Sequence, residues 1–278
     1  MLSSAVPPIS LGSWPTPVEP LARCAQALGL GGPEDLWIKR DDVTGLGGGG
    51  NKIRKLQYTC AQALAVGATT LITTGAPQSN HARLTASAAA RLGLRCVLVL
   101  GGAEPESAQG NLVLDALAGA EIVWAGGDTA SALDAAVQAV ADSGGVPFVI
   151  PFGGTSAVAA QGYVDCAREI EQQLAGVDRV VVALGSGGTM AGLVAHLAST
   201  ELWALMSGLL PIQCRLSLGC WTRCLVRLCE PQIFRSCETK LDKDIRRSRK
   251  HQPARFDYWL VRRASSSTRR TPAEPLRD

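Results

Sequence analysis

The stretch Gly-Gly-Gly-Gly-Asn-Lys-Ile-Arg-Lys-Leu, residues 47–56, places a lysine where a glycine-rich turn leads into a predicted helix. A helix N-terminus carries about half a positive charge, so Lys52, Arg54 and Lys55 stand at the unfavourable end. Four successive glycines permit close approach of the backbone to a ligand, and Asn51 is placed to cap the helix. One chemical explanation is that Lys52 is not a cation but forms an imine with an aldehyde cofactor whose phosphate lies nearby. The alternative is a solvated lysine on an amphipathic helix.

On both sides of this turn, short apolar runs alternate with alanine-rich stretches up to about residue 200. Several of the runs are apolar on both faces, which favours an α/β fold with mainly parallel sheets covered on both sides. The predicted strands are residues 35–39, 69–73, 95–100, 121–124, 147–150 and 179–184, and the predicted helices are residues 51–66, 79–92, 108–118, 129–142, 157–174 and 188–199. Ligands of such folds bind beyond the carboxyl ends of strands, where loops enter helices.

A second loop with unusual chemistry, residues 75–83, follows the strand at 69–73. Ser79, Asn80 and His81 there enter an alanine-rich helix, whose free N–H groups and positive end suit a carboxylate. The alternative is that Ser79 or Asn80 only caps the helix and that His81 is solvated. No other histidine or cysteine lies at ligand spacing from His81, so no metal site is expected.

A third loop follows the most apolar strand and is rich in glycine. Such a loop makes a nest of N–H donors for phosphate, to which hydroxyl groups add further donors. It lacks the ending of a nucleoside triphosphate loop and does not match the dinucleotide fingerprint, so a short phosphate monoester is the expected guest. Its residues are Gly185, Ser186, Gly187, Gly188 and Thr189.

The three loops together suit pyridoxal phosphate holding an amino acid, and further motifs occur in order. The chain resembles, over about residues 12–200, the pyridoxal-phosphate enzymes of the tryptophan synthase β-like fold (fold type II). Within them it is similar to the group containing D-cysteine desulfhydrase and 1-aminocyclopropane-1-carboxylate deaminase. The segments that carry this resemblance are Thr16-Pro17, residues 39–42, residues 49–56, residues 78–83, residues 153–156 with Gly162-Tyr163, and residues 185–189.

The resemblance implies a role for each loop. Lys52 would form the internal aldimine, with Asn51 beside it, and would later move the α-proton of the substrate. Asn80 would hydrogen-bond the ring oxygen of the cofactor, and Ser79, with Asn80, His81 and backbone amides, would hold the substrate carboxylate. The loop at 185–189 would bind the phosphate.

The resemblance also implies a lyase that acts on a small amino acid. His81 and the Gly-Ser-Gly-Gly-Thr loop favour the desulfhydrase branch, which converts D-cysteine to pyruvate, ammonia and hydrogen sulfide by α,β-elimination. Deamination of the cyclopropane amino acid is the alternative. A homodimer is the habit of the family. The sequence shows no apolar run long enough to cross a membrane and no nucleic-acid-binding motif, so a cytoplasmic location is expected.

Composition changes at about residue 200. Residues 1–200 contain 11 lysines and arginines against 16 aspartates and glutamates, whereas residues 201–278 contain 16 against 8. The second segment also holds five of the nine cysteines and three of the six tryptophans. We therefore predict a large cofactor-binding domain at 1–53 and 158–200, incomplete because its C-terminal part is replaced, a small α/β domain at 54–157, and an unrelated, poorly ordered basic tail at 201–278.

Three hypotheses concern this tail. The spacing of Cys220, Cys224 and Cys229 is not that of a zinc finger, so zinc is not expected. The basic run at 246–250 is interpreted as a solvated charge run. The preferred hypothesis is a shifted reading frame or aberrant exon after about residue 200, in which case the chain is either a working lyase or a truncated, inactive homologue.

Overall fold

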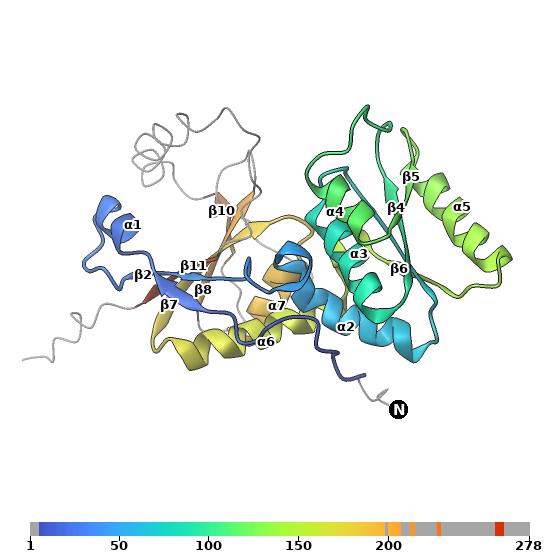
Figure 1. The fold of residues 1–278 in the computed structure, drawn as a ribbon. Helices are drawn as coiled ribbons and strands as arrows, with labels where there is room; N and C mark the ends of the chain where they lie inside the picture. Colours follow the sequence, from blue (N-terminus) through green and yellow to red (C-terminus); the bar gives the residue numbers. More distant parts are fainter. Residues whose placement is uncertain (1–5, 198–199, 207–211, 215–226, 229–258, 264–278) are drawn as a thin grey trace, which may run out of the picture.

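The computed structural model describes residues 6–197, 200–206, 212–214, 227–228 and 259–263 (Figure 1). In this part of the chain two β-sheets lie apart from each other, each with its own helices (Figure 1). None of the helices described is long and apolar enough to cross a membrane.

The smaller sheet is the parallel α/β sheet that the sequence predicts. Its strand order is β5-β4-β3-β6, and all three pairings are parallel. The apolar residues Leu71, Ile72, Leu98 and Val99 are fully buried in it, because helices cover both faces. Its strands are β3 (Thr70–Gly75), β4 (Arg95–Leu100), β5 (Glu121–Trp124) and β6 (Pro147–Ile150), and its helices are α3 (Asn80–Leu92), α4 (Asn111–Leu117) and α5 (Thr129–Asp142).

The larger sheet departs from the expected parallel arrangement. Its order is β1-β2-β11-β7-β8-β9-β10, and among its described strands only β7 and β8 pair in parallel. Part of the reason is that β11, from beyond residue 200, is inserted antiparallel to both β2 and β7; β1, β9 and β10 also pair antiparallel to their neighbours. The strands are β1 (Val18–Pro20), β2 (Leu36–Lys39), β7 (Val177–Leu184), β8 (Glu201–Met206), β9 (Ile212–Cys214), β10 (Arg227–Leu228) and β11 (Trp259–Arg263).

The predicted poorly ordered tail thus contributes described strands, of which β8 and β11 pair directly with β7. The cysteines from Cys220 to Cys237 and the basic run at 246–250 lie outside the described residues.

Two helices connect the two sheets, α2 (Lys52–Ala65) between β2 and β3 and α6 (Ala157–Gln173) between β6 and β7; α7 (Gly188–His196) joins β7 to β8 within the larger sheet. Two glycines let these helices approach closely. A Cβ at Gly162 would lie 2.2 Å from the carbonyl oxygen of Arg54, and one at Gly192 would lie 2.3 Å from that of Ala160. Helix α6 is therefore packed tightly between α2 and α7. Through these two helices it links the loops that lead into them, which belong to the candidate site.

The predicted elements up to residue 197 are all present, several with the expected bounds. The sequence did not predict β1, helix α1 (Ala22–Ala27), or the 3₁₀ turns η1 (Leu46–Gly48) and η2 (Phe152–Gly154), because elements this short carry no periodicity. Cys60, Cys96 and Cys166 are buried, whereas Cys24 is half-buried.

Candidate active site

The glycine turn before Lys52 is tightly enclosed. Gly49 has a φ of +76°, and a Cβ there would lie 1.9 Å from the carbonyl oxygen of Asp42. A Cβ at Gly47, where φ is +57°, would lie 2.2 Å from the hydroxyl of Ser87 on α3. Any side chain at either position would clash, so the turn needs glycine for both its backbone conformation and its close packing.

Arg83 joins this turn to the second loop. Its guanidinium donates to the carbonyl oxygens of Gly47 and, at 3.0 Å, of Gly49. Arg83 belongs to α3, the helix that begins directly after Ser79, and its side chain is buried. One side chain therefore fixes the lysine turn against the helix that carries the predicted carboxylate pocket.

Asn51 does not cap α2 as predicted. It stands at the N-cap position, but its φ of −62° and ψ of −19° are already helical, and its side chain makes no capping bond. Its side-chain oxygen instead accepts from the Nζ of Lys52 at 3.0 Å, and its carbonyl accepts from the hydroxyl of Tyr163 at 2.7 Å. Asn51 thus orients the lysine amine while α6 fixes the backbone of the turn.

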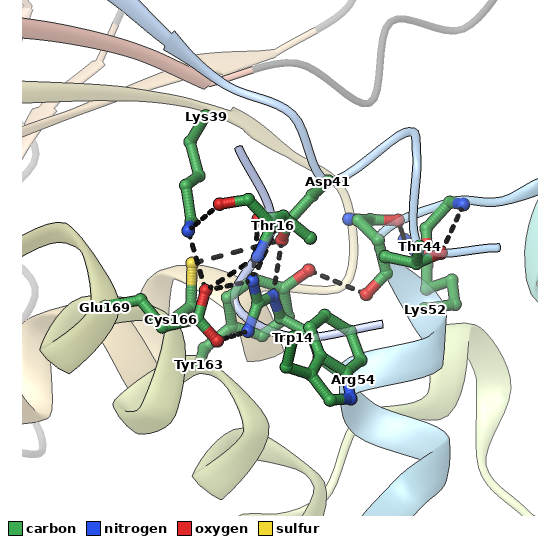
Figure 2. A network of polar contacts seen from close by, with 12 residues as sticks. Trp14, Thr16, Lys39, Asp41, Thr44, Lys52, Arg54, Tyr163, Cys166 and Glu169 are labelled. Carbon is green, nitrogen blue, oxygen red and sulfur yellow. Dashed lines mark hydrogen bonds and ion pairs between the residues drawn. The ribbon is translucent and has the colours of Figure 1, made fainter. Parts of the chain in front are cut away.

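Arg54, which the sequence places at an unfavourable helix end, is held by two acids, of which Asp41 is buried and Glu169 is half-buried. Figure 2 shows its guanidinium between Asp41 and Glu169. It donates to both oxygens of Asp41 at 2.8 Å and to those of Glu169 at 2.9 and 2.8 Å. Lys39 donates to the same carboxylate of Glu169 at 2.6 Å. The network joins β2, α2 and α6, and its central residue, Arg54, follows Lys52 by two positions.

In the second loop, Ser79 caps a helix, whereas His81 is a buried side chain. The Ser79 hydroxyl caps α3 by accepting from the N–H of Ala82 at 3.2 Å, which is the structural alternative predicted for it. His81 is not solvated, because only 3% of its surface is exposed. Its Nε2 lies 2.9 Å from the hydroxyl of Thr73, which donates its own proton to the carbonyl oxygen of Ile150.

The hydrogen bonds of Thr73 fix the protonation of this ring. Because the Thr73 proton is used on a carbonyl, Nε2 of His81 must be the donor and Nδ1 the acceptor. Burial, with the charges of Lys52 and Lys55, lowers the pKa of His81 to about 3, so the ring is neutral. It has no N–H left for a substrate carboxylate, and this geometry gives no support to that predicted contact.

The third loop lies close to Lys55 of α2 and to the segment between β6 and α6. The Nζ of Lys55 donates to the carbonyl oxygen of Gly153 and the hydroxyl of Thr155, each at 3.2 Å, and the Thr155 hydroxyl lies 2.5 Å from that of Ser186. A Cβ at Gly188 would lie 2.9 Å from the Lys55 Nζ. The absence of a side chain at 188 therefore keeps open the space between Lys55 and the start of α7.

The start of α7 has free donors for an anion. Its N-cap residue, Gly187, has a φ of 80° and makes no side-chain capping bond. The first-turn N–H groups of the helix are then not satisfied by a cap, and the helix dipole adds positive potential. Gly185 and Ser186 are exposed beside it, and Thr189 is buried.

The charges around Lys55 fit a phosphate group. Lys55 is buried and its hydrogen-bond partners are neutral oxygens. Burial together with the charge of Lys52 lowers its pKa to about 7. A dianion there would restore its protonation and accept from the α7 amides. The donor set therefore fits pyridoxal phosphate, with Lys52 available for its aldehyde.

Sequence reasoning did not assign a role to Lys55 or to Thr155. The available signal was spacing, because residues three apart lie on the same side of a helix and Lys55 follows Lys52 by three. In the described ranges, no group of three or more histidine, cysteine or acidic side chains is arranged to hold a metal ion.

Comparison with known proteins identifies the family. Residues 9–216 match the family model described as pyridoxal-phosphate dependent enzyme, and the chain belongs to this family. D-cysteine desulfhydrases of Salmonella choleraesuis (strain SC-B67) and Salmonella newport (strain SL254) are each 46% identical to it over 203 residues. The match covers 69% of this chain and 60% of each relative, so the chain spans about 60% of the length of these relatives.

Solved structures agree on the fold. A structure described as an ACC deaminase homologue is 38% identical, with a TM-score of 0.64, and the match covers 71% of this chain and 62% of that one. Diaminopropionate ammonia lyase of Escherichia coli in its apo form is 21% identical, with a TM-score of 0.52 over 70% of this chain and 58% of that one, and shows the fold alone. The predicted fold type II class is thereby confirmed.

Proposed function

We propose that this chain is a pyridoxal-phosphate-dependent lyase that carries out α,β-elimination on D-cysteine, releasing pyruvate, ammonia and hydrogen sulfide. The observation that carries the proposal is the position of Lys55, which contacts Thr155 and lies beside Gly188 at the start of α7, three residues after the lysine amine of Lys52. The 46% identity to D-cysteine desulfhydrases supports the choice of substrate.

The bound cofactor would supply an electron sink for the carbanion at the α-carbon of the substrate. The chain's own residues have separate tasks. Lys52 is the base that removes the α-proton, and Asn51 directs its amine. Lys55, Thr155, Ser186 and the amides that begin α7 hold the phosphate, which anchors the reacting end beside Lys52.

The start of α3 would fix the orientation of the substrate. The Ser79 hydroxyl uses a lone pair on the Ala82 amide, which leaves its proton for a carboxylate oxygen. With the carboxylate held there and the amino group on the cofactor, one α-substituent faces Lys52. In this arrangement the enzyme distinguishes the D from the L form by which enantiomer turns its proton toward the lysine.

The experiment reconstitutes purified protein with pyridoxal phosphate and measures both the visible absorbance of bound cofactor and sulfide release from D- and L-cysteine. We expect the band in the wild type and sulfide from the D form. Lys52→Ala should lose both, and Lys52→Arg, which keeps the charge but cannot condense with an aldehyde, should also lose both. Sulfide release retained by either variant would contradict the role of Lys52.

A second candidate is deamination of 1-aminocyclopropane-1-carboxylate, which is favoured by the 38% identity to the ACC deaminase homologue. This substrate has the same carboxylate and amine, so the same groups would bind it. The product distinguishes the two, because ring opening gives 2-oxobutanoate and elimination from cysteine gives pyruvate. Assay of both 2-oxo acids with each substrate decides between them.

A third candidate is an inactive homologue, because the composition of the chain changes at about residue 200. Protein that stays colourless with the cofactor would support it. The proposed origin, a shifted frame or aberrant exon after about residue 200, predicts that another frame of the coding DNA restores a family-like sequence. The domain limits, the homodimer and the cytoplasmic location remain predictions.

A further inference from the structure

A short turn before α4 is hydrogen-bonded to the second loop of the site. The side-chain amide of Gln78 donates to the carbonyl oxygen of Gln109 at 2.9 Å and accepts from the N–H of Asn111 at 2.9 Å. Gly110 lies between them with a φ of +56°, and a Cβ there would lie 2.4 Å from the Gln78 side-chain oxygen. The turn at 109–111 is thus built to fit the residues that precede α3.

Asn111 extends this hydrogen-bonded contact to Asn80. Its side-chain Nδ2 donates to the carbonyl oxygen of Gln78 and to the Oδ1 of Asn80, each at 3.0 Å. A backbone carbonyl can only accept, so it fixes which end of the Asn111 amide faces the loop. Both hydrogens of Nδ2 are then used, and Asn80 must turn its oxygen toward Asn111. The NH₂ group of Asn80 therefore points away from Asn111.

We propose that Asn111 is a positioning residue, which acts by holding Asn80 with its NH₂ group toward the ring oxygen of the cofactor. The proposal rests on the function proposed above. The ring oxygen carries negative charge and needs a donor, whereas a reversed Asn80 would present its own oxygen and repel it. Nothing in Asn80 itself selects one orientation, since its amide ends are nearly equal in shape.

The decisive variant is Asn111→Asp, which has almost the same shape but cannot donate. Asn80 should then turn its NH₂ group toward the new carboxylate and its oxygen toward the cofactor. A hydrogen-bond donor stabilises negative charge on the ring oxygen. Loss of this donor should therefore make the protonated form of the bound chromophore more stable. We expect the pH midpoint of the absorbance band, recorded without substrate, to rise by about one unit, and the cofactor dissociation constant to rise about tenfold.

Two controls isolate the contact. Gln109→Glu adds the same charge to the same turn, but its side chain bonds Ser107 and not Asn80, so its midpoint should equal that of the wild type. In an Asn80→Ala background, Asn111→Asp should leave the midpoint where Asn80→Ala alone puts it, because the residue through which it acts is gone. Asn111→Ala, which leaves Asn80 able to turn either way, should give an intermediate shift.

The outcomes separate the two proposals. A wild type that shows no cofactor band would overturn the proposed function, and this inference with it. A wild type with a normal band but an unchanged Asn111→Asp midpoint, or a shift that persists without Asn80, would overturn the inference alone. Far-ultraviolet circular dichroism checks folding, which an acid in the first turn of α4 should favour electrostatically.

Discussion

At the scale of single residues, Lys55 is the residue whose surroundings are least predictable from the sequence. In the sequence it is one of three cations in a helix first turn, with no assigned task. In the structure its side chain is buried, and its ammonium lies against the segment between β6 and α6 and beside the start of α7. A buried cation with only neutral partners lowers the stability of the cofactor-free protein. Binding of a phosphate would remove this destabilisation, and the recovered free energy would add to the affinity for the cofactor.

We predict that Lys55→Met makes the cofactor-free protein more stable at pH 7 while weakening cofactor binding. The pKa of Lys55 is about 7 in the folded protein and 10.5 ordinarily, so the unfolded chain binds more protons between these values. The unfolding free energy of the wild type should therefore rise, relative to the variant, from pH 7 to 10. The change should be on the order of a few kcal/mol.

Urea denaturation of both proteins at several pH values measures this difference. Inorganic phosphate serves as a probe of the site and should stabilise the wild type more than the variant at pH 7. A difference that does not change with pH, or equal stabilisation by phosphate, would show that Lys55 is not the titrating cation of this site.

At the scale of secondary-structure elements, the Arg54 network holds three elements in register behind Lys52. We predict that Arg54→Met destabilises the protein by about 3–5 kcal/mol, because it leaves the buried carboxylate of Asp41 without its charged partner. The matched control is Arg168→Met, which removes an exposed ion pair to Asp165 and should cost less than about 1 kcal/mol. Thermal and urea denaturation give both values; equal effects would contradict a special role for the buried pair.

The elements themselves were well predicted from sequence, for a local reason. The period of apolar residues and the glycines at helix ends are recorded within a few residues, and α5, β4, β5 and β6 have the expected bounds. The position of Lys52 at the start of α2 was equally local. The burial of His81 was not, since it depends on Thr73 and a carbonyl from β6.

At the scale of the whole molecule, the unexpected feature is β11. It lies between β2 and β7, so its backbone hydrogen-bonds on both edges. We predict that Val261→Pro, which removes one backbone donor from this interior strand, lowers the unfolding free energy by about 1–3 kcal/mol. Val261→Thr keeps the N–H and the β-branched shape and should be close to neutral. Thermal denaturation measures both, and a neutral proline would show that β11 does not pair in solution.

The sequence by itself determined the fold class, the order of helices and strands up to residue 197, and the three loops that carry chemistry. Those features depend on periodicity, glycine content and residue type, which are properties of neighbouring residues. Only the tertiary structure decided that Lys55 contacts Thr155 and lies beside Gly188, that Arg54 pairs with Asp41 and Glu169, and that Asn111 hydrogen-bonds Asn80. Each of these hydrogen bonds joins residues 13 to 115 positions apart, and all of them lie at least partly out of solvent, where polar groups must find partners that local sequence does not specify.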